Sequence, residues 1–106
     1  MEMLTGGYYK ATIHRVIQPP PDQRNLERLG VFYFTMANDN TKLVPFTESP
    51  KLQQEGVKRR IEDESAPTMG EWRRGIIQSY GFTKLQRRDD RIEEEVVNGI
   101  LVKHYN

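Results

Sequence analysis

The sequence predicts a mainly β protein with helices in its C-terminal part, which places it in the α+β fold class. Residues 6–17 and 28–36 are rich in aromatic and β-branched residues that alternate in their side-chain character, a pattern typical of β-strands. A capping-box sequence, Thr68-Met-Gly-Glu71, then opens a stretch with apolar residues at helical spacing. With 106 residues, the chain has the length of one small domain.

The first predicted strand, residues 6–17, is entered through a pair of glycines, which favours a turn. Alternation along this strand places His14 on the same face as Lys10 and Thr12, whereas the opposite face is more apolar. An imidazole in the middle of a polar face is better suited to lining a cavity than to packing in a core.

A proline-rich connector separates the first predicted strand from the second. Residues 19–21 are all proline and supply no N–H donors, so they cannot continue a sheet. Residues 28–36 are apolar on both alternating faces, as in a strand that is covered on each side. Arg28 begins this strand and Gly30 follows on the same face, which leaves open space beside the guanidinium. The two strands are predicted to pair antiparallel.

Two helices are predicted next along the chain. Ser49 and Pro50 provide an N-cap and a first helical residue for a short helix that ends near Gly56. Residues 58–65 carry charges of both signs and are predicted to form a solvent-exposed loop. The capping box then begins a longer helix that ends before Gly81.

The C-terminal residues are predicted to add a third helix and a short extended segment. Residues 87–97 are highly charged, with Ile92, Val96 and Val97 as an apolar stripe, and Gly99 is expected to end this helix. Residues 100–105 are expected to form a terminal strand or an extended tail.

Composition excludes several classes of function. There are no cysteines, which excludes disulfide scaffolds and cysteine-ligated metals. The charged residues nearly cancel to a formal net charge of +1, so we expect neither a nucleic-acid partner nor an anionic membrane. No apolar run approaches the ~20 residues of a membrane span. We expect a cytoplasmic protein.

Only one arrangement of residues indicates chemistry. The sequence contains no nucleophile motif, phosphate loop or His/Cys metal-binding pattern. A neutral imidazole at His14 can ligate a divalent metal, and the Arg28 guanidinium can bind a carboxylate through two parallel hydrogen bonds. Together they would hold an anionic cosubstrate beside a metal. A lone strand histidine is nonetheless more commonly a hydrogen-bonded structural residue.

The sequence around these two residues resembles a known family. Gly7-x-Tyr9-Lys10-Ala11-Thr12-x-His14-Arg15-Val16, followed by Arg28-x-Gly30-Val31-x-Tyr33-Phe34, is similar to the C-terminal part of the isopenicillin N synthase-like Fe(II)- and 2-oxoglutarate-dependent dioxygenases. The resemblance covers essentially the whole chain, and residues 97–106 are similar to fungal members. It implies a partial double-stranded β-helix, or jelly roll, with barrel strands in residues 1–47 and helices and a tail in residues 48–106.

The resemblance also implies roles for individual residues. His14 matches the distal histidine of the iron site, a two-histidine, one-carboxylate triad. Arg28 matches the arginine that binds the far carboxylate of 2-oxoglutarate. Gly30 departs from the pattern, because the family usually has a serine there. The missing hydroxyl implies either lower cosubstrate affinity or a water molecule in its place. The implied cofactor is Fe(II), with 2-oxoglutarate as cosubstrate. The implied activity is oxidation of a small molecule, as in fungal secondary metabolism.

Two of the three iron ligands of that family have no match here. They form a His-x-Asp motif upstream of the distal histidine, and the thirteen residues before His14 contain neither histidine nor aspartate. Glu2 and His104 do not correspond to ligands in the family, and His104 is expected to be a surface or packing residue. We therefore expect the chain alone to bind iron weakly and to be inactive, with no catalytic residue assigned.

Three hypotheses follow from this incomplete set. In the first hypothesis, the chain is the C-terminal portion of a longer fungal-type oxygenase whose N-terminal half is missing here. Alternatively, it is one half of a split oxygenase, or a non-catalytic remnant that acts through exposed apolar strands. Neither the substrate nor the oligomeric state is defined by the sequence.

Overall fold

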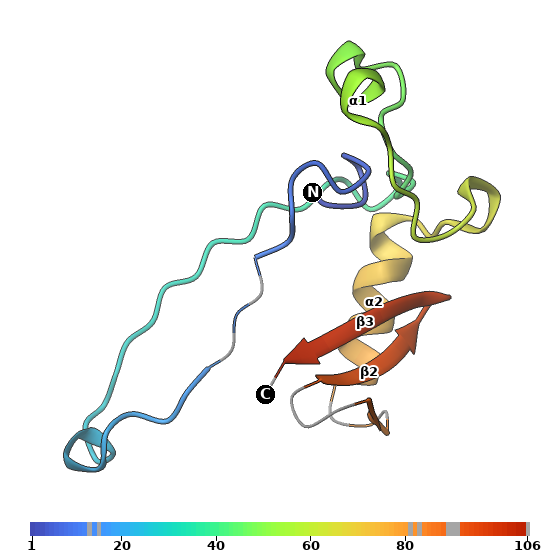
Figure 1. Cartoon of the computed structure of the whole chain (residues 1–106). Coiled ribbons are helices and arrows are strands. Elements are labelled where there is room, and N and C mark those ends of the chain that lie inside the picture. Colours follow the sequence, from blue (N-terminus) through green and yellow to red (C-terminus); the bar gives the residue numbers. More distant parts are fainter. Residues whose placement is uncertain (13, 15, 81, 83, 89–91, 106) are drawn as a thin grey trace.

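The computed structural model describes residues 1–12, 14, 16–80, 82, 84–88 and 92–105 (Figure 1). They form a mixed α+β structure in which a three-stranded antiparallel sheet has the order β1-β2-β3. The strands are β1 (Gln86–Arg87), β2 (Ile92–Val97) and β3 (Ile100–Tyr105), the α-helices are α1 (Pro50–Glu55) and α2 (Met69–Ser79), and short 3-10 turns occupy Pro21–Gln23 and Asp63–Ser65. The sheet therefore follows the helices along the chain, whereas the sequence predicts strands before helices.

Helix α2 begins at the predicted capping box. The Thr68 hydroxyl accepts a hydrogen bond from the Glu71 backbone N–H over 3.3 Å, and the Glu71 carboxylate accepts one from the Thr68 N–H over 2.8 Å. These bonds satisfy two donors that a helix start otherwise leaves unpaired. The Thr68 backbone N–H, followed by the hydroxyl, holds the pKa of Glu71 below its ordinary value. The predicted helices α1 and α2 are confirmed as elements. Ser49 precedes α1, but its side chain makes no capping hydrogen bond, and Gly81, predicted to end the longer helix, lies outside the described residues.

The predicted helix over residues 87–97 is wrong, because residues 92–97 form strand β2 of a hairpin with β3. Asn98 and Gly99 connect the two strands with φ angles of 49° and 76°. Two successive positive φ angles are what a type I′ hairpin turn requires, and Asn-Gly is its preferred sequence. Gly99 therefore turns a hairpin instead of ending a helix. The terminal strand predicted over residues 100–105 is confirmed.

Helix α2 packs on one face of this hairpin (Figure 1). Val97 and Ile100 face each other across the register and are buried, and Ile100 has 0% of its surface exposed. Gly75 allows this contact, since a Cβ on Gly75 would lie 2.5 Å from Asn98 Oδ1 and 2.8 Å from Val97 Cγ1. Glycine lowers helix propensity by roughly 1 kcal/mol relative to alanine, and here it admits the hairpin turn.

The described residues between 8 and 37 form an extended arm with its tip at Pro21–Gln23, and its two legs run side by side (Figure 1). The predicted barrel strands over 6–17 and 28–36 are wrong as hydrogen-bonded strands, since the described residues of both stretches lack strand structure. Residues 27–37 form no backbone–backbone hydrogen bond with other described residues. Ile13 and Arg15 of the first prediction lie outside the described residues.

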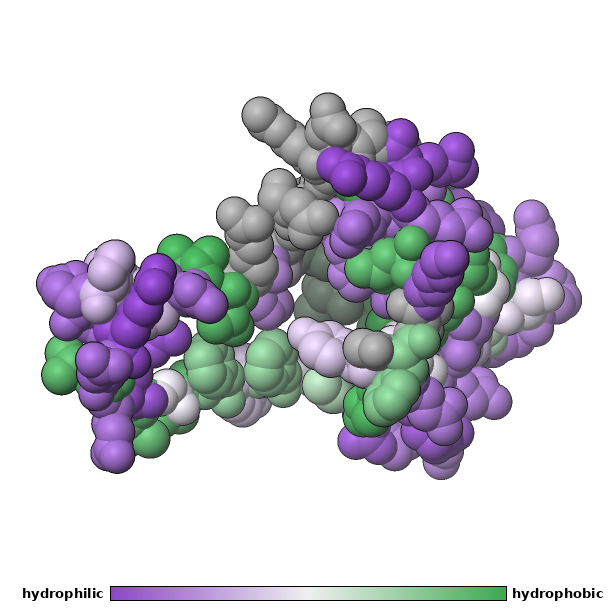
Figure 2. Space-filling view, turned by 90° about the horizontal axis from the view of Figure 1, so that it is seen from below, coloured by the Kyte–Doolittle hydropathy of each residue, from purple (hydrophilic) through white to green (hydrophobic). Residues whose placement is uncertain are grey.

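The arm exposes the apolar side chains that the sequence pattern assigns to a covered strand. Leu29, Val31 and Tyr33 are 92%, 90% and 89% exposed, and Figure 2 shows apolar side chains along the arm. A β-strand needs a neighbouring strand to pair with its backbone groups, and no described segment provides one. The described residues of the arm are therefore extended but do not belong to a sheet.

No helix in the part of the chain that the structure describes is long and apolar enough to span a membrane.

The sheet contains a buried carboxylate that makes stability depend on pH. Arg88 Nε donates to Glu94 Oε2 over 2.6 Å, and Lys103 Nζ lies 3.6 Å from Glu94 Oε1. The Arg88 hydrogen bond, together with the two positive charges, lowers the pKa of Glu94. A carboxyl group with a lowered folded-state pKa stabilises the fold above its unfolded pKa of about 4.3. This stabilisation is lost as the pH falls through the folded-state pKa.

Glu94→Gln is expected to reduce the loss of stability below about pH 4.3. The free energy of unfolding, measured in urea between pH 7 and pH 3, should change less with pH in the variant than in the native chain. Glu93→Gln, on the neighbouring residue of β2, is the matched control and should leave the pH profile unchanged. Identical profiles for Glu94→Gln and the native chain would contradict the assignment.

Candidate functional site

His14 lies on the outgoing leg of the arm and is exposed. Its Nδ1 lies 3.0 Å from the carbonyl oxygen of Thr12. A carbonyl oxygen can only accept, so Nδ1 carries the proton and donates, which leaves the lone pair of Nε2 in the neutral ring free. A backbone carbonyl that holds the other ring nitrogen is the usual support for a metal-ligating histidine. The His14 ring also lies 6.4 Å from the Phe34 ring on the returning leg, centroid to centroid.

Arg28 lies on the returning leg and is exposed, and it forms no hydrogen bond or ion pair with the described residues. Its five N–H donors are therefore available to a ligand. The Phe32 ring occupies the space at Gly30, because a Cβ on Gly30 would lie 2.8 Å from Phe32 Cε2. A serine at this position would require the ring to turn aside, which an exposed side chain can do.

The structure places His14 and Arg28 on opposite legs of one arm, and no direct contact joins them. Among the described residues, no group of three or more histidine, aspartate or glutamate side chains lies close enough to hold a metal ion. His14 is thus suited to be one ligand, and the described part of the chain does not complete an iron site around it. His104 lies in the hairpin, where Nε2 is 2.9 Å from Glu95 Oε1.

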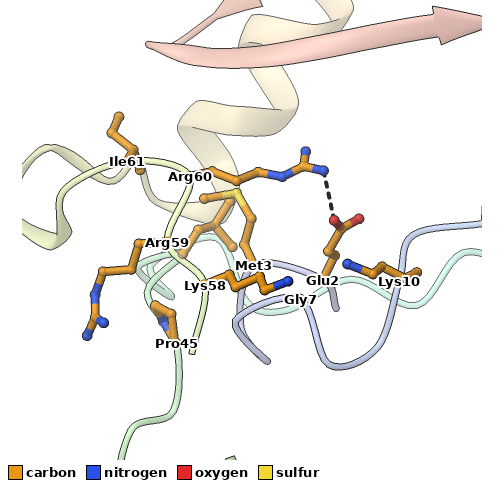
Figure 3. A pocket seen from close by; sticks show the side chains of 10 residues that line it. Glu2, Met3, Gly7, Lys10, Pro45, Lys58, Arg59, Arg60 and Ile61 are labelled. Carbon is orange, nitrogen blue, oxygen red and sulfur yellow. Dashed lines mark hydrogen bonds and ion pairs between the residues drawn. The ribbon is translucent and has the colours of Figure 1, made fainter. Parts of the chain in front are cut away.

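A cavity of about 220 Å³ lies at the base of the arm (Figure 3). Glu2 lies at its edge and joins three segments: its carboxylate accepts from Arg60 Nη2 over 2.7 Å and from the Ala11 backbone N–H over 2.9 Å. Residues 58–61 line this cavity, although the sequence predicts a simple solvent-exposed loop there. The basic run at residues 58–60 is visible in the sequence, but its contact with Glu2 is not.

A second cavity, of about 200 Å³, has a mainly apolar lining to which Glu2, Thr35 and Arg60 also contribute, and the sequence does not indicate it. All four methionines of the chain and its single tryptophan contribute to it: Met1, Met3, Met36, Met69 and Trp72. Methionine side chains adapt to irregular apolar ligands. The arm provides Ala11 and residues 35–37 of the lining, so this cavity meets the outgoing leg three residues before His14.

Comparisons with known proteins give no relative for this chain. No protein-family model matches it, no curated protein is significantly similar to it, and no solved structure matches it.

Proposed function

We propose that the chain is the C-terminal part of an Fe(II)- and 2-oxoglutarate-dependent oxygenase of the isopenicillin N synthase-like type. Two observations carry the proposal. The His14 imidazole is exposed on one leg of the arm and keeps Nε2 free of the described residues, and the exposed Arg28 guanidinium on the adjoining leg has no partner among them. This pair offers one metal ligand and one carboxylate anchor. In such an oxygenase, Fe(II) and 2-oxoglutarate supply the oxidising chemistry when bound.

The described residues do not fit a complete iron site, and this limits the role of the chain. His14 is one ligand, and no second or third ligand accompanies it among the described residues. We therefore assign binding and orientation to the chain, with the remaining ligands supplied by other polypeptide. By itself the chain is inactive.

The exposed apolar residues of the arm support the proposal that the chain is part of a larger domain. Strands in a jelly roll are covered by an opposing sheet, and the legs of the arm carry apolar side chains on uncovered backbone. Pairing with the N-terminal half of an oxygenase domain would cover them. The same observation favours a second candidate, in which a separate polypeptide supplies that half and forms a split oxygenase.

The lining of the second cavity supports a small apolar substrate. Four methionines and Trp72 surround about 200 Å³, and pockets for small organic molecules are mainly apolar with few polar groups. Ala11 of the outgoing leg and residues 35–37 of the returning leg line this cavity, so it lies where both legs begin.

The proposal is tested by adding Fe(II) anaerobically to the ¹⁵N-labelled chain and recording paramagnetic broadening of its amide resonances. We expect weak binding, with broadening centred on the residues around His14. The broadening should disappear in His14→Ala and persist in His104→Ala, which removes the only other histidine. Broadening that is unchanged in His14→Ala would overturn the assignment of the ligand.

A second measurement tests the proposal that the isolated chain does not hold a complete iron site. With Fe(II) and 2-oxoglutarate together, the isolated chain should show no metal-to-ligand charge-transfer band of full stoichiometry. Such a band in the isolated chain would show that it holds a complete site. Its appearance only after co-expression with a polypeptide that carries a His-x-Asp segment would support the split oxygenase.

A further inference from the structure

We infer that the cavity at the base of the arm is a binding site for a small oxyanion, held between the ammonium groups of Lys10 and Lys58. This site is separate from His14 and Arg28, and it does not depend on the proposed oxygenase function. Figure 3 shows the two ammonium groups directed toward one another above Gly7. Both side chains line the same cavity, and a bound anion would carry the charge opposite to theirs.

The charges around the cavity are unbalanced. Among the described residues that line it, Glu2 is the only acidic one, against four basic ones. Arg60 is paired with Glu2, at 2.7 Å. Arg59 is directed away from the cavity and is paired with Asp63 through two hydrogen bonds, of 2.8 Å and 3.1 Å.

After these two ion pairs, Lys10 and Lys58 are left without a carboxylate partner among the described residues. The cavity therefore offers two positive charges that the described protein does not neutralise. A negatively charged ligand is the chemistry that complements them.

The backbone around Gly7 holds Lys58 in place and lies close to the Lys10 ammonium group. The Gly7 N–H donates to the Glu2 carbonyl oxygen over 2.9 Å, and the Lys58 N–H donates to the Gly6 carbonyl oxygen over 2.9 Å. A Cβ on Gly7 would lie 3.5 Å from Lys10 Nζ and 3.9 Å from Lys58 Cβ. Both lysines therefore flank Gly7, whose φ of +84° favours glycine.

The size and lining of the cavity define the class of ligand. Its volume of about 220 Å³ is smaller than the roughly 300–1,000 Å³ of pockets that hold drug-sized molecules. The remaining lining is mainly apolar and comprises Met3, Leu43, Pro45 and Ile61. A phosphate or carboxylate group on a short carbon skeleton fits both parts of this surface. Because both lysines are exposed, binding will weaken as salt is added.

The experiment is an NMR titration of the ¹⁵N-labelled chain with inorganic phosphate and, separately, with malonate, at constant ionic strength. We expect saturable shifts of the Gly6, Gly7 and Lys58 amide resonances with at least one of the two anions. Tighter binding of phosphate would indicate a phosphorylated ligand, and tighter binding of malonate a carboxylic acid. Shifts that rise linearly without saturation would overturn the proposal.

Lysine variants locate the site. Lys10→Met and Lys58→Met should each weaken binding at least fivefold, and Lys58→Arg should retain most of it. Lys84→Met is the matched control, because Lys84 is an exposed lysine that lines a different cavity, and it should bind as the native chain does. An equal loss in Lys84→Met would show general attraction of anions to a basic surface and would overturn the proposal.

Arg28→Ala separates this site from the proposed oxygenase site. It should leave the shifts at Gly6 and Gly7 unchanged. Loss of those shifts in Arg28→Ala, with normal binding in Lys10→Met, would assign the anion to the returning leg beside Arg28 and overturn the inference here.

Discussion

Replacing Ile100 by alanine is expected to lower the free energy of unfolding by about 2–5 kcal/mol. Ile100 has no exposed surface, so its truncation removes apolar contacts and leaves a cavity between the hairpin and α2. Small domains are stable by only about 5–15 kcal/mol. We therefore expect Ile100→Ala to remove a large part of the stability of the chain, measured by urea titration with the fluorescence of Trp72, the single tryptophan, as the signal.

The matched control is Leu101→Ala, at the next residue of β3. Successive side chains of a strand point to opposite faces, and Leu101 is 43% exposed. Its truncation should cost less than about 1 kcal/mol, as for surface substitutions in general. Equal effects of the two substitutions would show that the buried face of the hairpin is not where the structure places it.

Replacing Arg28 by alanine is expected to weaken the binding of 2-oxoglutarate at least about tenfold. Hydrogen bonds to charged groups contribute roughly 1.5–3 kcal/mol each, and the guanidinium offers two parallel ones to a carboxylate. Arg28→Lys should also bind poorly, because an ammonium group keeps the charge and loses the planar fork. The measurement is an NMR titration of the ¹⁵N-labelled chain with 2-oxoglutarate, followed at the resonances of residues 28–30.

Arg24→Ala is the control for Arg28→Ala. Arg24 is also exposed on the arm, and its Nε lies 3.5 Å from the Pro19 carbonyl oxygen. Its removal takes away the same charge near the tip, so it should leave the affinity for 2-oxoglutarate within about twofold. Equal weakening by both substitutions would mean that the arm attracts the dicarboxylate through its charge alone, and the assigned role of Arg28 would be wrong.

Elements whose limits are set within one turn of the chain could be predicted from the sequence. The Thr68 and Glu71 side chains bond to each other's backbone across three residues, so the start of α2 is a local property. Pro50 likewise stands at the start of α1 with the backbone angle that a helix needs. Neither helix start required knowledge of a distant contact.

Strand β2 could not be predicted in the same way, because its apolar stripe is ambiguous. Ile92, Val96 and Val97 fit a helical stripe, but Val97 is buried because it faces Ile100 across the hairpin. The signal that was missed is Asn98-Gly99, a pair that favours a hairpin turn. This pair indicates the hairpin, whereas the charge pattern of residues 87–95 indicates a helix.

The arm shows a different limit of sequence patterns. Alternating apolar residues indicate that a segment is able to form a strand, and they do not provide a partner for its backbone. Residues 28–36 remain extended without a sheet for this reason. The candidate residues His14 and Arg28 could be identified from their motif. The contact between Glu2 and Arg60 could not, because the two residues are 58 positions apart.

The exposed arm also determines how the isolated chain is degraded. Proteases cleave backbone that enters their active site in an extended form. A segment without backbone hydrogen bonds can enter at little free-energy cost, because no local structure has to unfold first. Phe32, Tyr33 and Phe34 lie in such a segment and are exposed, so an enzyme that cleaves after aromatic residues will cut there before it reaches α2 or the hairpin. Cleavage of the isolated chain should therefore begin in the arm and leave the segment with α2 and the hairpin as the more resistant part.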